Sequence, residues 1–317
     1  MRRLYYYRIC GLITASEVYL PEAEPVGAAP DADVTVLFGS LEYDISQYPG
    51  VKNPGGIWYY CFVDYGRMLF RSGGIDFEVS GGSRIVIDTH GGDRDSADLH
   101  IYLLGTAFGT IHMQRGNVPV HGASIEGRSG ATIITGYSGS GKSAVLGALA
   151  LDGFHFLADD VSVVTTENGI PEVLPGYPQR KIACDDAVSL GYDVAGLEVI
   201  NEDNRDKYVI RRPGEWRRDR MRLSAVVEIT RAYREDGERV DPVFREIKGQ
   251  NSLRLVMRNL YRSHFYGSTG IMPDIMKKIL VLTSGIRTYQ LIRPYEGMSV
   301  WETAELIVSG CEGIKRA

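Results

Sequence analysis

The segment Gly136–Ser143, which reads GYSGSGKS, constrains this chain more than any other part of the sequence. It fits the pattern G-x-x-x-x-G-K-[ST] at every fixed position. Glycines let the backbone turn tightly, so that successive N–H groups face inward and bind phosphate oxygens. Lys142 would add a positive charge at the β- and γ-phosphates, and Ser143 would offer its hydroxyl to a magnesium ion. The predicted nucleotide-binding residues are Gly136, Ser138, Gly139, Ser140, Gly141, Lys142, Ser143 and Ala144.

The segments on either side of this loop support the same interpretation. Residues 131–135 form a short apolar run typical of a strand, and residues 143–151 are typical of a short apolar helix. A glycine-rich hairpin that matches the pattern by chance is the alternative, but it does not require a strand before the loop and a helix after it. The order of elements therefore predicts an α/β nucleotide-binding unit.

An acidic pair, Asp159 and Asp160, follows a second predicted strand at residues 154–158. Phosphoryl transfer needs a carboxylate for magnesium, and a kinase also needs a group that accepts the hydroxyl proton. Adjacent carboxylates can divide these tasks, because neighbours on an extended chain point in different directions. The alternative is one magnesium-binding aspartate with a solvated neighbour, as in an ordinary ATPase. Both interpretations stay open at this point.

His121 follows an apolar stretch and is a candidate catalytic residue. A lone histidine in such a place is more often a satisfied core residue. We interpret the remaining histidines in that way; they are His90, His100, His112, His155 and His264.

These three features together resemble the HPr-kinase-like family, which includes the bacterial HPr serine kinase/phosphorylases. The pair His121–Gly122 begins 15 residues before Gly136, and the acidic pair begins 17 residues after Lys142, as in that family. The surrounding segment 153–161, GFHFLADDV, is also similar, and the resemblance covers residues 117–165. It implies a phosphate-binding-loop domain of the HPr-kinase and phosphoenolpyruvate-carboxykinase type, with ATP and Mg²⁺ as cofactors.

The resemblance also implies a role for each residue of the site. Asp159 would be the general base toward the acceptor hydroxyl, and Asp160 with Ser143 would hold magnesium. His121 would lie beside the phosphates or the catalytic aspartate, and Lys142 would complete the catalytic set.

The chain departs from the HPr enzymes after the acidic pair. Those enzymes carry a motif close to E-I-R-G-L-G, whereas residues 174–181 read LPGYPQRK, which argues against phosphorylase activity and against HPr as substrate. The segments 7–12, 16–21, 116–121 and 175–178 instead resemble a branch that includes kinases of lasso-peptide precursors. That resemblance implies transfer to the C-terminal serine of a short precursor peptide. A carrier protein or small molecule as acceptor, or a non-catalytic nucleotide-binding regulator, are the alternatives, and the intact acidic pair argues against the last.

We expect an α/β chain, α+β overall, with a β-rich region at 1–94, a connecting helix within 95–116 and the catalytic domain at 117–317. The β-rich region should form an antiparallel sheet or small sandwich, because short aromatic and β-branched runs alternate with glycine turns. Its expected strands are 4–12, 34–38, 57–65, 68–71 and 85–87. Apolar residues at four-residue steps predict a helix over 95–113, with Asp95 or Ser96 as its cap. Later expected elements are strands at 223–230 and 288–292 and helices at 252–266, 273–280 and 299–308.

A basic segment at 205–222 carries eight lysines and arginines and three acids. Arginine forks match carboxylate and phosphate geometry, so this segment could close over a phosphate or an acidic peptide end. For most of these side chains we favour the alternative of a solvated loop paired with nearby acids. The candidates for phosphate or acceptor contact are Arg180, Lys181 and Lys207. The aromatic run 57–60 is a candidate peptide contact, although strand aromatics are more often core.

The charge balance argues against nucleic acid as a partner, because 35 basic and 40 acidic residues leave a formal net charge of −5. The sequence has no apolar run of membrane-spanning length and no signal peptide. Its four cysteines are too far apart for a metal knuckle or redox pair, which predicts reduced thiols and a cytoplasmic protein. The sequence does not distinguish ATP from GTP, or a monomer from a homo-oligomer.

Overall fold

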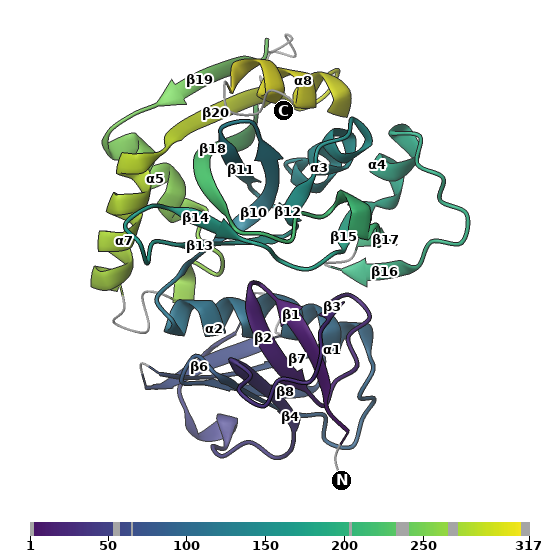
Figure 1. Cartoon of the computed structure of the whole chain (residues 1–317), viewed down its shortest axis with the longest axis vertical. Helices are drawn as coiled ribbons and strands as arrows, with labels where there is room; N and C mark the ends of the chain where they lie inside the picture. The colour runs from purple at the N-terminus through teal and green to yellow at the C-terminus, as the bar shows by residue number, and fades with distance from the viewer. Residues whose placement is uncertain are drawn as a thin grey trace. The chain divides into compact units, whose positions relative to one another are not determined.

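The computed structural model describes residues 3–52, 58–64, 66–202, 205–232, 241–265 and 272–311. The chain divides into two compact units (Figure 1). The first comprises residues 1–119 and 262–276, and the second comprises residues 120–261 and 277–317. The predicted connecting helix therefore belongs to the first unit, and a later segment of the chain returns to that unit.

The first unit contains a nine-stranded sheet in the order β3-β1-β2-β4-β9-β8-β7-β6-β5. The strands are β1 (Tyr5–Ile9), β2 (Leu12–Ser16), β3 (Glu24–Pro25), β4 (Val34–Phe38), β5 (Val51–Lys52), β6 (Trp58–Asp64), β7 (Arg67–Ser72), β8 (Ile75–Ser80) and β9 (Arg84–Asp88). The expected antiparallel sheet or sandwich is corrected to one mixed sheet, because β4 runs parallel to both β2 and β9.

The expected strands of this sheet were wrong in two respects. The run 4–12 is not one strand, because Cys10 and Gly11 adopt positive φ angles of 48° and 79° and turn the chain from β1 into β2. Strand β8 was not predicted, although the Gly73–Gly74 turn that leads into it was. Residues 53–57 and Tyr65, which include part of the aromatic run, lie outside the described residues.

The predicted helix of the first unit is confirmed, with an irregular middle. It consists of α1 (Ala97–Tyr102), the π-helical turn η2 (Leu103–Ala107) and α2 (Phe108–Gln114). The Ser96 hydroxyl accepts a hydrogen bond from the Leu99 N–H at 3.3 Å, as expected for an N-cap. The apolar stripe is fully buried, and the Gln114 amide donates to the Val79 carbonyl of β8.

The second unit is built on an eight-stranded sheet with the path β11-β10-β13-β14-β18-β20-β19, and β12 pairs with β10. Strand β11 also pairs with β18, so part of the path closes on itself. The strands are β10 (Val118–Gly127), β11 (Gly130–Gly136), β12 (Phe156–Ala158), β13 (Val161–Thr165), β14 (Glu172–Leu174), β18 (Met221–Ala232), β19 (Val243–Ile247) and β20 (Arg287–Pro294). A small sheet of β15 (Arg180–Ala183), β17 (Arg205–Ile210) and β16 (Val199–Glu202) lies beside it.

Helix α3 (Lys142–Leu151) occupies the centre of the second unit's core. Eight of its ten residues are buried, which is why its sequence is apolar all round rather than amphipathic. It packs against α8 (Val300–Gly310), whose first turn carries a capping box between Ser299 and Glu302. The Tyr192 hydroxyl donates to the Gly147 carbonyl at 2.9 Å and ties a neighbouring loop to α3.

Further helices with described bounds are α4 (Cys184–Ser189), α5 (Gln250–Arg258) and α7 (Met272–Gly285), with the single turns η1 (Ile45–Gln47) and η3 (Pro213–Glu215). The helix predicted over 252–266 ends early, at Arg258, and α7 continues five residues beyond the predicted end at Leu280. No helix in the described part of the chain is long and apolar enough to cross a membrane.

Candidate active site

The glycine-rich loop connects the carboxyl end of β11 to the first turn of α3. Gly136 has a φ of 142°, and a Cβ at this position would lie 2.3 Å from the Ile229 carbonyl oxygen, so only glycine fits. Gly141 caps α3 with a φ of 100°, and no side chain of a described residue accepts a hydrogen bond from the N–H groups of the first turn. These N–H groups and the positive end of the helix dipole are available to an anion.

Lys142 lies over this loop with an almost fully buried side chain. Its Nζ donates to the carbonyl oxygens of Gly136 and Tyr137, each at 2.9 Å. Burial lowers the pKa of Lys142 to about 8, although the charges of Asp160 and Asp159 act in the opposite direction. A buried ammonium held by two neutral carbonyls is a favourable position for a phosphate group.

The chain brings the acidic pair to the same place, at the end of β12. Asp159 is 8% exposed, and its Oδ1 lies 3.4 Å from the Ser143 hydroxyl, which donates to it. The Lys181 N–H donates to Asp159 Oδ2 at 2.8 Å. Burial raises the pKa of Asp159, and the Asp160 charge raises it further, while the Lys181 N–H lowers it.

Asp160 faces a different set of residues because the backbone turns sharply at this position. Its φ is 69°, a conformation uncommon outside glycine, and the Val161 N–H donates to the Asp159 carbonyl across it at 2.9 Å. Asp160 Oδ1 lies 3.5 Å from His121 Nδ1, and each side chain is about one-third exposed. Although burial alone would raise the pKa of Asp160, the charges of Lys181, His121, Lys207 and Lys142 lower it below its usual value.

The contacts of the two aspartates are therefore exchanged relative to those that the family resemblance implies. Ser143 lies against Asp159 rather than Asp160, and His121 lies against Asp160. A backbone hydrogen bond fixes the position of His121, because its N–H donates to the Asn259 carbonyl at 2.8 Å. Its ring also packs near the ring of Tyr261, a residue that the sequence analysis did not select.

Two of the three weak candidates, Lys181 and Lys207, lie next to the acidic pair. Both ammonium groups donate to Glu202, at 2.6 Å each, so that one carboxylate is held between two cations. Burial alone would lower the pKa of Lys181, but the charges of Glu202 and Asp160 raise it above its usual value. The charges of Lys181 and Lys207 act on both aspartates and favour their ionised forms.

Arg180, the third weak candidate, has another environment. Its side chain is 2% exposed, and its guanidinium pairs with Glu215 and donates to the Tyr192 hydroxyl at 3.1 Å. A side chain enclosed in this way holds α3 and its neighbouring loops together and does not reach a substrate. For most of the basic segment 205–222 the expected pairing of arginines with acids is confirmed, but the expected loop is not, because residues 205–210 form β17 and residues 221–222 begin β18. These pairs are Arg205–Asp185, Arg211–Glu198, Arg212–Glu215, Arg217–Glu126 and Arg220–Glu172.

The donor set at the loop fits a magnesium ion. Ser143 Oγ and Asp159 Oδ1 are both hard oxygen ligands that lie side by side. Among the residues that the structure describes, no group of three or more His, Cys, Asp and Glu side chains is arranged to hold a metal ion. Magnesium in nucleotide sites takes one or two carboxylates, with phosphate oxygens and water as the remaining ligands.

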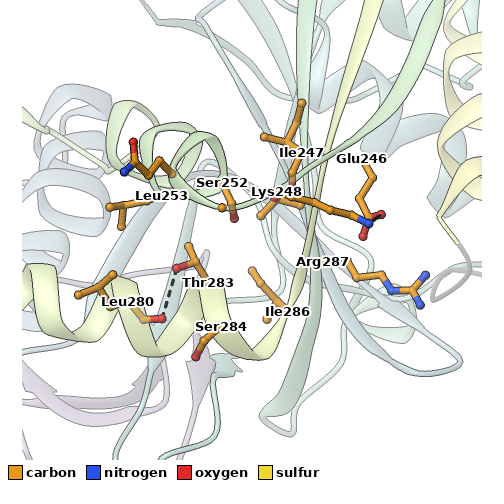
Figure 2. A pocket seen from close by; sticks show the side chains of 13 residues that line it. Glu246, Ile247, Lys248, Ser252, Leu253, Leu280, Thr283, Ser284, Ile286 and Arg287 are labelled. Atoms are coloured by element: carbon orange, nitrogen blue, oxygen red, sulfur yellow. Dashed lines mark hydrogen bonds and ion pairs between the residues drawn. The ribbon is translucent and has the colours of Figure 1, made fainter.

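A separate groove of about 440 Å³ lies between α5, α7, β19 and β20 (Figure 2). Several of its polar side chains already have partners: Lys248 pairs with Glu246 at 2.9 Å, and the Thr283 hydroxyl donates to carbonyls within α7. None of the residues that line it belongs to the glycine loop or the acidic pair.

Comparisons with known proteins show a distant likeness to solved structures. No protein-family model matches the chain, and no curated protein does. Among solved structures, the chain is similar to the HPr(Ser) kinase/phosphatase from Coxiella burnetii, with 14% sequence identity and a TM-score of 0.31, over 61% of this chain and 93% of that one. Both values are low, so the function of this chain has to be inferred from its own residues.

Proposed function

We propose that this chain is an ATP-dependent kinase that transfers the γ-phosphoryl group to a hydroxyl group. One observation carries the proposal: Ser143, at the end of the glycine loop, contacts the first of two adjacent carboxylates, and the charges of both carboxylates act on Lys142. A nucleotide-binding regulator needs the loop and a magnesium ligand. The second carboxylate, accessible and next to a histidine, has a use only if a proton must be accepted.

We assign the metal side of the site to Asp159 with Ser143, and the acceptor side to Asp160 with His121. Their contacts support this division, which reverses the one that the family resemblance implies. Asp159 is buried and already accepts backbone hydrogen bonds at both oxygens, so it is poorly placed to meet an incoming hydroxyl. Asp160 is partly exposed and can reach one.

The electrostatics of the pair support the same division. A cation beside Asp159 would offset the burial that raises the pKa of this carboxyl. The cations around Asp160 lower its pKa in the free protein, but a bound triphosphate would neutralise part of their charge. Asp160 would then become more basic when the nucleotide is in place.

The reaction follows from these positions. Lys142 and the loop N–H groups hold the β- and γ-phosphates, and magnesium, when bound, neutralises charge on the phosphate oxygens. The acceptor oxygen forms a bond to the γ-phosphorus as its proton passes to Asp160. The bond from the γ-phosphorus to the bridging oxygen breaks, and ADP leaves with that oxygen. His121 orients the Asp160 carboxylate.

We propose a short ribosomal peptide as the acceptor, through the C-terminal serine of a lasso-peptide precursor. The sequence resemblance of segments 7–12, 16–21 and 175–178 supports this choice. A carrier protein or small molecule is the second candidate for the same chemistry. None of the four cysteines forms a disulfide in the described part of the chain, which supports a reaction in the cytoplasm.

Radiolabelled ATP provides the test. Incubation with Mg²⁺ and a precursor peptide that ends in serine should label the peptide, and a peptide that ends in alanine should stay unlabelled. Lys142→Ala should abolish labelling. If the chain binds ATP yet labels no peptide, carrier protein or small hydroxyl compound, the regulator is the correct reading and the kinase proposal fails.

A further inference from the structure

Three parallel strands of the second unit end at the same edge of the sheet. Strand β11 pairs in parallel with β18, and β18 pairs in parallel with β20. Strand β11 leads directly into the glycine loop, while β18 and β20 carry the opposed residues Arg231 and Arg293 one position before their last residues. Ligands of open α/β sheets bind outside the carboxyl ends of parallel strands. Two arginines therefore lie at the edge where the phosphate loop begins.

Arg293 is enclosed against the loop itself. The residue is 6% exposed, and its Nη1 lies 3.5 Å from the position that a Cβ on Gly141 would occupy. Gly141 is the N-cap of α3, so this guanidinium adjoins the N–H groups available to an anion. Arg231 differs, because it is exposed and its guanidinium lies over the ring of Tyr295.

The hydrogen-bonding capacity of Arg293 is only partly used. Its Nη2 donates to the Met298 carbonyl at 2.6 Å, whereas no described residue accepts a hydrogen bond from its buried Nε. Within the described ranges, no carboxylate lies within 4.0 Å of the guanidinium. Asp186 and Glu302 act on it only from farther away, and Arg231 adds a like charge.

A guanidinium buried in this way is costly in the free protein. Burial and the Arg231 charge lower the pKa of Arg293, which means that its surroundings disfavour the cation. Buried charges in proteins are normally paired, and buried donors are normally satisfied. An anion that accepts hydrogen bonds from a planar guanidinium would complete this site, and phosphate oxygens do so well.

We propose that Arg293 is a nucleotide-binding residue, whose guanidinium donates to phosphate oxygens of the nucleotide held by the loop 136–143. The inference rests on the proposed function only in taking a nucleoside triphosphate as the ligand. It adds a binding residue from β20, more than 140 residues beyond the glycine motif. A structural alternative is that Arg293 only anchors the turn at Met298.

Binding of ATP and of inorganic pyrophosphate by calorimetry tests the proposal, with wild type, Arg293→Met, Arg293→Lys and the control Arg245→Met. Arg245 lies on the neighbouring strand β19, is exposed and donates to Gln290 at 2.7 Å. Loss of charge-assisted hydrogen bonds should weaken both ligands about ten- to hundredfold in Arg293→Met. The affinities of Arg293→Lys should lie between those of wild type and Arg293→Met, because lysine keeps the charge but not the planar guanidinium. Arg245→Met should bind both ligands as wild type does.

Thermal unfolding of the same proteins separates a binding role from a structural one. Arg293→Met should leave the Tm of the free protein unchanged or raise it, because it removes an unpaired buried charge, and should reduce the Tm gain given by pyrophosphate. A lower Tm of the free protein together with wild-type pyrophosphate affinity would make Arg293 a structural anchor and overturn the inference.

The results also separate this inference from the proposed function. Pyrophosphate binding that depends on Arg293, without phosphoryl transfer to any acceptor, supports the inference and refutes the kinase. Transfer by an Arg293→Met variant whose affinities for ATP and pyrophosphate stay within twofold of wild type refutes the inference and supports the kinase. A wild-type chain that binds neither ligand refutes both.

Discussion

Exchanging the carboxylates of the acidic pair for amides, one at a time, tests the division of labour between them. Asp160→Asn keeps the size of the side chain but removes the proton acceptor on the acceptor side. It should lower kcat and leave the affinities for metal and ATP close to wild type. Asp159→Asn removes the carboxylate that touches Ser143 and should raise the metal concentration needed for activity.

The size of each effect follows from the contacts. A positioned general base contributes about 10²- to 10⁴-fold, so Asp160→Asn should raise the activation free energy by about 3–5 kcal/mol. The environment of Asp160 is compatible with a general base, because its carboxylate is one-third exposed and lies 3.5 Å from His121. Asp159→Asn replaces a charged ligand beside Ser143 by a neutral amide oxygen, so metal affinity should fall by at least about tenfold.

Two measurements give the answer. Initial rates at saturating ATP and acceptor, over a range of Mg²⁺, separate kcat from the metal requirement. Manganese binding to the ADP complex, followed by electron paramagnetic resonance, reports the metal site without turnover. Asp219→Asn is the matched control, since this carboxylate is 80% exposed and lies 3.9 Å from Arg217, outside the site.

The opposite pattern would refute the reasoning. If Asp159→Asn lost turnover with unchanged manganese affinity, while Asp160→Asn weakened manganese binding, the roles implied by the family resemblance would be correct. The short contacts in the free protein would then be rearranged when the nucleotide binds.

Two further predictions concern the fold. Gly136→Ala should lower the free energy of unfolding by about 3 kcal/mol in a urea titration, because its Cβ would lie 2.3 Å from the Ile229 carbonyl and its φ of 142° is strained for alanine. The control Gly214→Ala, where a Cβ meets open space, should change the free energy of unfolding by less than about 0.5 kcal/mol. Burial lowers the pKa of His112 to about 3. Below pH ~6.5 the unfolded chain therefore binds a proton that the native chain does not, and the free energy of unfolding decreases as the pH is lowered. Between pH 7.5 and 5 this accounts for a loss of ~2 kcal/mol, which should be missing from His112→Gln, and an unchanged pH slope in that variant would contradict it.

Local chemistry made the centre of the site predictable. The glycine spacing, the strand before it and the apolar helix after it agree with β11 and α3, because each is specified within a few residues. The cap at Ser96, one of two candidates in the sequence, was predictable for the same reason, since an N-cap needs one hydroxyl just before a helical stripe.

Features decided by distant partners were not predictable. The mixed first sheet depends on β4 pairing with β2 and β9, and no local pattern separates parallel from antiparallel neighbours in such short strands. Arg180 carries the same charge in the sequence as the exposed arginines near it. Its burial depends on Glu215 and Tyr192, which only the fold brings to it. Arg293 had one readable signal, its place directly after a strand predicted at 288–292.

The exchange of partners within the acidic pair has a more specific cause. Alternation along an extended strand does predict that Asp159 and Asp160 point in different directions, but not which of them meets Ser143. That choice is made by the left-handed turn at Asp160, whose φ of 69° is closed by the hydrogen bond from Val161 to Asp159. Aspartate tolerates this conformation better than most residues, at some cost in strain, and such strain concentrates where a side chain must be held in one direction. The turn keeps Asp159 against Ser143 and aims Asp160 at His121, so the backbone at a single residue separates the metal side of the proposed site from its acceptor side.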